Sequence, residues 1–173
     1  MTGAFVFDRG ETIARLRDSL ATIESFLALV PAQWTHTPPP GSPEGAWSVA
    51  MNLAHLVIYE ECIAAPLLDA MAAGGDGAGS VRAVSEAAFL EDAIAIAGQP
   101  LPALLERLRG VRARQIDAIA PMSDIEFNRP ATPLFSARSA GVSHPASWVA
   151  TKTFQHTWEH GNAILRVAMF APR

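Results

Sequence analysis

The sequence of 173 residues predicts an all-α protein, a single domain built as a four-helix bundle. Hydrophobic residues recur at intervals of three and four along four long segments, which is the period of an amphipathic helix. Proline and glycine separate these segments, and none shows the strict alternation typical of a strand. Half of the residues are hydrophobic, so a chain of this length can bury a core of its own. We therefore expect one domain over residues 1–173.

The first two long helices are expected at about 8–30 and 49–72. Pro31 ends the first, because proline cannot continue a helix. Ser48 is a suitable N-cap for the second, since its hydroxyl can accept a hydrogen bond from the first turn. Pro66 lies inside the second helix, and we expect it to kink the helix there.

The third long helix is expected at about 101–120, with Pro102 in its first turn, and the fourth is expected to begin near 144–147 and to run to about 170. A shorter and less regular helical pattern covers about 86–97. The stretch 122–144 contains two prolines and no sustained period, so it predicts a long ordered loop between the third and fourth main helices, in which a short hairpin would fit. Loops of this length in compact domains are often functional.

Charge and hydropathy exclude several classes of partner. The net charge is −4, and no extended basic stripe is present, which argues against nucleic acid. No apolar run approaches the roughly 18 residues that span a bilayer, so a membrane protein is not expected. The N-terminal segment carries charges within its first turns and no apolar signal core, which indicates a cytoplasmic protein. The one cysteine, Cys62, is expected to fill the core.

Two histidines four residues apart in the last helix, His156 and His160, carry most of the functional information. An α-helix places residues i and i+4 on one face, so both imidazoles can point at a common atom. Both lie on a seam whose ends are apolar, and His55 lies on a similar seam of the second helix. Three inward histidines favour a metal site over three separate core residues. We expect His36 and His144 to lie in loop or cap positions outside it.

Several neighbours of these histidines are candidates for a supporting role. Asn52 and Tyr59 flank His55 at i−3 and i+4, where either could orient an imidazole, but ordinary packing is the simpler interpretation of both. Glu159 completes the pattern H-x-x-E-H of inverted zincins, in which the glutamate is the general base. We reject a protease, because no acidic residue follows His160 to complete the ligand set.

Charged and aromatic residues elsewhere are expected to be structural. The arginines of the third helix form a basic patch that could recognise a carboxylate, but a solvated face is the simpler interpretation; they are Arg107, Arg109, Arg112 and Arg114. Glu60 and Glu61 are also expected on a solvated face. Three of the four tryptophans are expected to be core or interface residues rather than substrate platforms: Trp47, Trp148 and Trp158.

Two segments resemble the DinB/YfiT-like superfamily of small bacterial four-helix proteins. They are AWSVAMNLAHLVIYEE, where the family has a tryptophan before a helix with one ligand histidine, and FQHTWEHGNAILR, which carries the H-x-x-x-H pair. The resemblance implies that His55, His156 and His160 bind a divalent ion, usually zinc or nickel in such proteins. It also implies a small-molecule substrate and pairing into homodimers through helices.

Characterised members of the family include transferases that use a low-molecular-weight bacterial thiol and a mycothiol-dependent isomerase. The resemblance therefore implies a metal-dependent transferase in which the metal activates a small thiol. Two alternatives remain open. One is a metal-dependent hydrolase with water in the open position of the metal. The other is a non-catalytic bundle whose site serves only metal or ligand binding.

Overall fold

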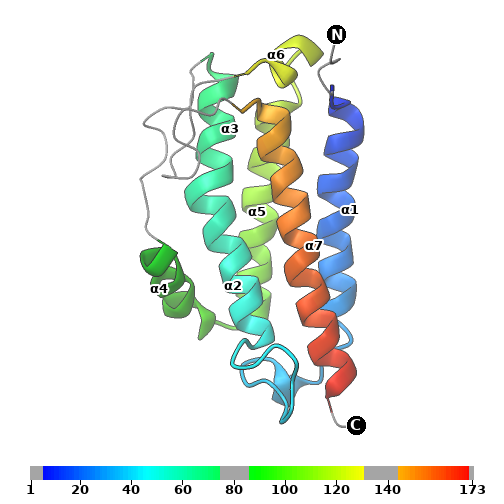
Figure 1. The fold of residues 1–173 in the computed structure, drawn as a ribbon, viewed down its shortest axis with the longest axis vertical. Helices are drawn as coiled ribbons and strands as arrows, with labels where there is room; N and C mark the ends of the chain where they lie inside the picture. The colour runs from blue at the N-terminus through cyan, green and yellow to red at the C-terminus, as the bar shows by residue number, and fades with distance from the viewer. Residues whose placement is uncertain (1–5, 75–85, 131–143, 172–173) are drawn as a thin grey trace.

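The protein folds as a four-helix bundle in the computed structural model, which describes residues 6–74, 86–130 and 144–171 (Figure 1). Three of the long members of the bundle are single helices: α1 (Arg9–Leu27), α5 (Leu101–Ile119) and α7 (Ala146–Phe170). The fourth is interrupted, and consists of α2 (Val49–Tyr59) and α3 (Ala65–Ala72). None of the described residues forms a β-strand. The predicted all-α bundle is thus confirmed.

Helix boundaries follow the capping residues of the sequence. Asp8 caps α1 by accepting a hydrogen bond from the backbone of Glu11, and Ser48 caps α2 by accepting one from Met51. The first helix ends at Leu27, three residues earlier than expected, because the chain tightens into i→i+3 hydrogen bonds before it reaches Pro31. A short 3₁₀ turn, η1 (Ala32–Trp34), then follows.

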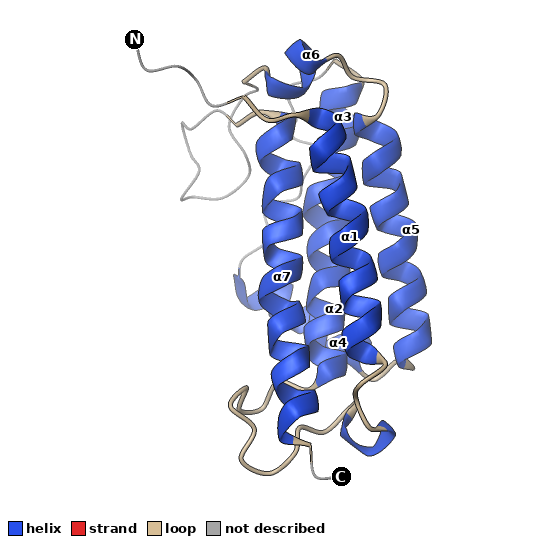
Figure 2. Ribbon diagram, turned by 90° about the vertical axis from the view of Figure 1, so that its right-hand side faces the viewer, coloured by secondary structure: helices blue, strands red, loops and turns tan. Residues whose placement is uncertain are grey.

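The four long members lie side by side, with α1 and α7 running in one direction and α2–α3 and α5 in the other (Figures 1 and 2). Helix α1 packs most extensively on α7, and α2 packs on both α5 and α7. The short helix α4 (Glu86–Ala97) matches its expected range and packs on the outside of α2. It therefore covers the face of α2 that the other three long helices leave open.

A π-turn, η2 (Glu60–Ala64), separates α2 from α3. In this turn the backbone N–H of Ala65 donates to the carbonyl of Glu60, five residues back rather than four. Pro66 lies two residues after the turn and has no N–H to donate, which removes an α-helical hydrogen bond at this point. The sequence predicts an irregularity near Pro66, and the structure gives its form as one wider turn.

The core consists of two apolar clusters with a polar layer between them. One cluster lies toward the α6 end of the bundle and includes Leu16, Leu67, Ile119, Phe127 and Val149. The other lies toward the opposite end and includes Ile23, Leu53, Leu104, Leu108 and Ile164. Each long helix contributes a buried polar side chain to the layer between them: Ser19, Glu60, Arg112, Gln115, Thr153 and Thr157.

Arg112 and Glu60 form an ion pair at the centre of this polar layer, where they are 1% and 0% exposed. Arg112 donates to the carboxylate of Glu60, to the carbonyl of Leu16 and to the hydroxyls of Ser19 and Thr157. One side chain thus hydrogen-bonds to the other three members of the bundle. The expectation that Arg112 and Glu60 lie on solvated faces is wrong. Both side chains are buried, and their ion pair and hydrogen bonds replace the hydrogen bonds that each would make with water.

The other arginines of α5 agree better with a solvated face. Arg107 pairs with Glu61, Arg109 with Glu24 and Glu106, and Arg114 with Asp69, all at positions that solvent reaches. These pairs tie α5 to its neighbours rather than forming a free basic patch. Cys62 is half-buried within the π-turn and belongs to neither apolar cluster, so its expected place in the core is wrong.

A short helix, α6 (Asp124–Asn128), lies at the start of the stretch that was expected to be a loop. Ser123 caps it, and Glu126 returns a hydrogen bond to the backbone of Ser123, so the two residues form a capping box. Phe127 anchors the helix in the core. The rest of the predicted loop, with its hairpin, lies outside the described residues at 131–143, as does most of the glycine-rich segment at 75–80.

The segment Val49–Ala72 is long and apolar enough, by length and composition alone, to cross a membrane. This corrects the expectation that no run approaches that length. In the structure 61% of its most apolar window is buried, and its side chains form much of both apolar clusters. The segment is therefore hydrophobic in the way that a central helix of a bundle is.

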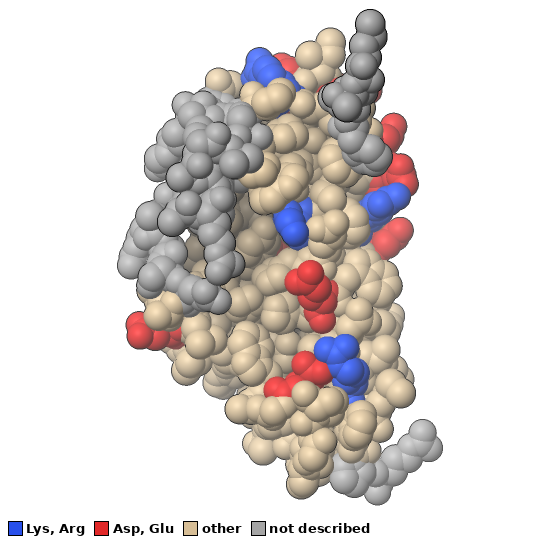
Figure 3. All heavy atoms as spheres, viewed as in Figure 1, with Lys and Arg blue, Asp and Glu red and all other residues tan. Residues whose placement is uncertain are grey.

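Acidic and basic side chains are interspersed on the face of the molecule that Figure 3 shows, and they gather into no patch of one sign there.

Candidate metal centre

Three imidazoles converge between α2 and α7. His55 comes from α2, and His156 and His160 come from successive turns of α7. The Nε2 atom of His156 lies 3.1 Å from Nε2 of His55 and 3.1 Å from Nε2 of His160. One ligand atom from each residue lies within 4.8 Å of the others. The structure thus brings together the three histidines that the sequence singles out, at half-buried positions.

The donor set suits a divalent transition-metal ion, and the two spacings to His156 suit a single ion. Two nitrogens 3.1 Å apart that each lie about 2.05 Å from one ion subtend an angle of roughly 100° at it, between octahedral and tetrahedral values. Neutral imidazole suits zinc, copper, iron and nickel. Hydrogen bonding alone accounts for the arrangement less well. Nε2 of His156 has one proton or one lone pair, so it can satisfy only one of its two neighbours.

Asn52 fixes the tautomer of His160. Its amide nitrogen donates to the carbonyl of Ser48 at 2.9 Å, which leaves its oxygen facing Nδ1 of His160 at 2.8 Å. An amide oxygen only accepts, so the proton of His160 resides on Nδ1 and its Nε2 keeps a lone pair for a metal. Asn52 is buried, and its geometry favours the supporting role over ordinary packing. The Nδ1 atoms of His55 and His156 are buried without a partner among the described residues.

Aromatic rings enclose the three imidazoles. Trp47 stacks on His160 with ring centroids 5.8 Å apart and meets His55 edge-on at 5.4 Å. Phe89 of α4 meets His55 at 4.8 Å, and Tyr59 meets His156 at 4.4 Å. The expectation that Trp47 is a core or interface residue therefore needs refinement, because Trp47 packs on the histidines themselves. Sequence reasoning missed Phe89, since nothing in its local pattern indicates that α4 folds back onto α2.

Burial controls the protonation of the cluster. Desolvation lowers the pKa of His156 to about 2, with further contributions from His160, His55 and Lys152. Desolvation also lowers the pKa of His160 to about 4, and that of His55 below its usual range. All three imidazoles are therefore neutral at pH 7, which is the form that binds a metal. Burial and the nearby carboxylates of Glu60 and Glu159 raise the pKa of Tyr59, so it stays a protonated phenol.

Other sequence candidates lie outside the cluster. His36 is exposed and contacts the carbonyl of Ala97, and His144 stacks on Trp148, in line with the loop and cap positions expected for them. Glu159 is exposed and does not belong to the group of possible metal ligands, which consists of His55, His156 and His160. Together with Tyr59, His156 and two further residues of α7, Lys152 and Gln155, it lines a pocket of about 120 Å³. We call this the His156 pocket.

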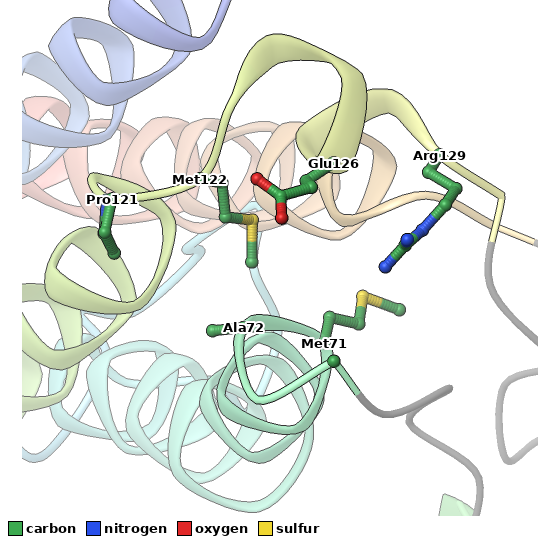
Figure 4. A pocket seen from close by; sticks show the side chains of 7 residues that line it. Met71, Ala72, Pro121, Met122, Glu126 and Arg129 are labelled. Atoms are coloured by element: carbon green, nitrogen blue, oxygen red, sulfur yellow. The ribbon is translucent and has the colours of Figure 1, made fainter.

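A second pocket, of about 110 Å³, lies near the α6 end of the bundle (Figure 4). Met71 and Met122 line it with Glu126 and Arg129. The carboxylate of Glu126 is engaged by Ser123 in the capping box. None of the three clustered histidines lines this pocket, so it is separate from the candidate metal centre.

The fold and the histidine cluster together describe a helical bundle with a candidate metal centre between two of its helices. The family model of the DinB superfamily matches residues 12–164, and the chain belongs to this superfamily. No curated protein sequence matches the chain.

Among solved structures, the chain is similar to the crystal structure of a mycothiol-dependent maleylpyruvate isomerase, with a TM-score of 0.67 and 19% sequence identity. A point mutant of the same enzyme gives the same values. The similarity covers 91% of this chain and 61% of that enzyme, so the chain matches less than two thirds of its length. At this identity, the similarity establishes the fold.

Proposed function

We propose that His55, His156 and His160 bind one divalent metal ion, zinc or nickel, and that the protein is a metal-dependent transferase that uses a low-molecular-weight thiol. The convergence of three Nε2 atoms from α2 and α7 is the observation that carries this proposal. Three protein ligands leave coordination positions for a further group, which distinguishes a catalytic site from a closed structural one.

The surrounding residues have defined tasks in this proposal. Asn52 holds His160 in the tautomer that offers Nε2, and Trp47 and Phe89 exclude water from one side of the cluster. When bound, a divalent ion supplies the Lewis-acid chemistry that lowers the pKa of a coordinated thiol. In this proposal, substrates reach the cluster through the His156 pocket, which His156 and Tyr59 line.

The choice of a thiol rests on the resemblance in sequence and on the similar fold of an enzyme that is named as mycothiol-dependent. A cytoplasmic location and a homodimer are parts of the same proposal, and the 45% exposed ring of Trp158 on α7 offers an apolar contact for a second subunit. A hydrolase would turn substrate over without added thiol. A bundle that only binds metal would turn over no thiol-reactive electrophile.

Elemental analysis of the untreated protein tests the metal centre. We expect about one divalent ion per chain, and loss of the ion in His156→Ala and in His160→Ala, because two imidazoles hold a metal far less tightly than three. The matched controls are His36→Ala and His144→Ala, which should keep full occupancy. Full occupancy in the double variant His156→Ala/His160→Ala would contradict the assignment. A cobalt-substituted sample should develop a sulfur-to-metal charge-transfer band on titration with thiol.

A further inference from the structure

The His156 pocket carries charges of both signs on the same face of α7. Lys152 lies four residues before His156, and Glu159 lies three residues after it. At a rise of 1.5 Å per residue, the two positions lie about 6 Å and about 4.5 Å from His156 along the helix axis, on opposite sides. A ligand in this pocket therefore meets a cation on one side of His156 and an anion on the other.

Both charges are available to a ligand. Lys152 and Glu159 are exposed, and neither forms an ion pair within residues 6–74, 86–130 and 144–171. Arg166 of α7 and Arg114 of α5 are also exposed, but they pair with Glu44 and Asp69. These two arginines are thus engaged in ion pairs, whereas the two charges that border the His156 pocket are not.

The pocket places both charges beside the histidine cluster. Lys152 and Glu159 line the same cavity as His156 and Tyr59. A ligand in this cavity therefore lies next to both charges and to one of the three clustered imidazoles.

We propose that the His156 pocket selects a zwitterionic thiol of about dipeptide length, with Lys152 binding its carboxylate and Glu159 its ammonium group. The inference rests on the proposed function, since it requires the sulfur to reach the histidine cluster. Free cysteine is too short to span the two charges, because its ammonium and carboxylate groups share one carbon atom. A cysteine-containing dipeptide carries them at opposite ends, with the thiol at an intermediate position.

Titration of the cobalt-substituted protein with four thiols tests this inference. Cysteinylglycine carries both charges, N-acetylcysteinylglycine lacks the ammonium group, cysteinylglycinamide lacks the carboxylate, and 2-mercaptoethanol lacks both. The charge-transfer band gives a dissociation constant for each. We expect cysteinylglycine to bind most tightly, with each solvent-accessible charge contributing about two- to fivefold in affinity and less at high salt.

Two variants assign the charges to residues. Lys152→Gln should weaken the two thiols that carry a carboxylate by about two- to fivefold and leave cysteinylglycinamide unchanged. Glu159→Gln should weaken the two that carry an ammonium group and leave N-acetylcysteinylglycine unchanged. Arg17→Gln and Asp18→Asn remove one charge of each sign from an exposed face of α1, and should change none of the four constants.

The outcomes separate this inference from the proposed function. A charge-transfer band with equal affinity for all four thiols, or variants at positions 152 and 159 that match the α1 controls, would overturn the zwitterion pocket and leave the thiol site intact. A cobalt protein that gives no band with any thiol, or a protein that holds no cobalt, would overturn the proposed function and the inference with it.

Discussion

The ion pair between Arg112 and Glu60 leads to a sharp prediction about stability. Replacing Arg112 with Met keeps most of the length of the side chain but removes the charge and every donor. The carboxylate of Glu60 would then stay buried, and among the described residues only Gln115 would still donate to it, at 2.6 Å. The carbonyl of Leu16 and the hydroxyls of Ser19 and Thr157 would lose their donor at the same time.

The expected cost follows from the burial of both partners, which are 1% and 0% exposed. Removing one partner of a buried ion pair typically costs about 3–5 kcal/mol, because the other charge remains without compensation. For a chain of this length that corresponds to a fall in Tm of about 6–20 °C. The double variant Arg112→Met/Glu60→Leu should lose less than Arg112→Met alone, since it leaves no buried charge behind.

Urea unfolding followed by circular dichroism would measure these differences. The matched control is Arg109→Met on the same helix, where the arginine is 46% exposed and pairs with Glu24 and Glu106. Exposed pairs contribute about 0–1 kcal/mol, so the control should stay within that range. If Arg112→Met costs no more than Arg109→Met, the ion pair does not stabilise the polar layer as argued.

Three further predictions concern the metal site, acid stability and α6. Asn52→Ala should weaken metal affinity about 10- to 100-fold, because His160 loses the acceptor that fixes its tautomer. Competition with a chelator would measure the affinity. If the loss is no larger than in the exposed control Asn162→Ala, the prediction is wrong. The metal-free protein should lose stability as pH falls below 6.5, because the imidazoles of His160 and His156, with pKa values of about 4 and about 2, stay neutral in the folded state and bind protons in the unfolded state. Urea unfolding should show that the free energy of unfolding falls by about 1.4 kcal/mol for each of these histidines by pH 5.5. A free energy of unfolding that stays constant between pH 7 and 5.5 would argue against this. Ser123→Ala should cost about 1 kcal/mol by removing the cap of α6, and unchanged thermal unfolding would show that the cap contributes nothing.

Periodicity and spacing predicted the fold and the convergence of the histidines well. The four long helices have the expected order, because proline, glycine and capping residues set their ends locally. The seam argument also placed His55, His156 and His160 on inward faces, since helical spacing fixes the direction of a side chain relative to its apolar neighbours. That the cluster binds metal stays a prediction.

Features that depend on contacts between distant segments were not predictable. A buried arginine and a buried glutamate have the same local pattern as exposed ones, and only their pairing across 52 positions makes burial favourable. Phe89 meets His55 only because α4 folds back over α2. Helix α6 differs from these cases, because the capping box that starts it, Ser123 to Glu126, is a local sequence pattern from which a short helix could have been predicted.

The π-turn also affects how this chain is compared with its relatives. A hydrogen bond five residues back in place of four means that the turn holds one residue more than a regular α-helix would, and a helix advances about 100° per residue. The side chains of α3 are therefore rotated by roughly that amount relative to the faces of α2. An ungapped comparison with a relative whose helix is regular would equate inward positions with outward ones beyond Glu60–Ala64, and a one-residue gap there restores the correspondence.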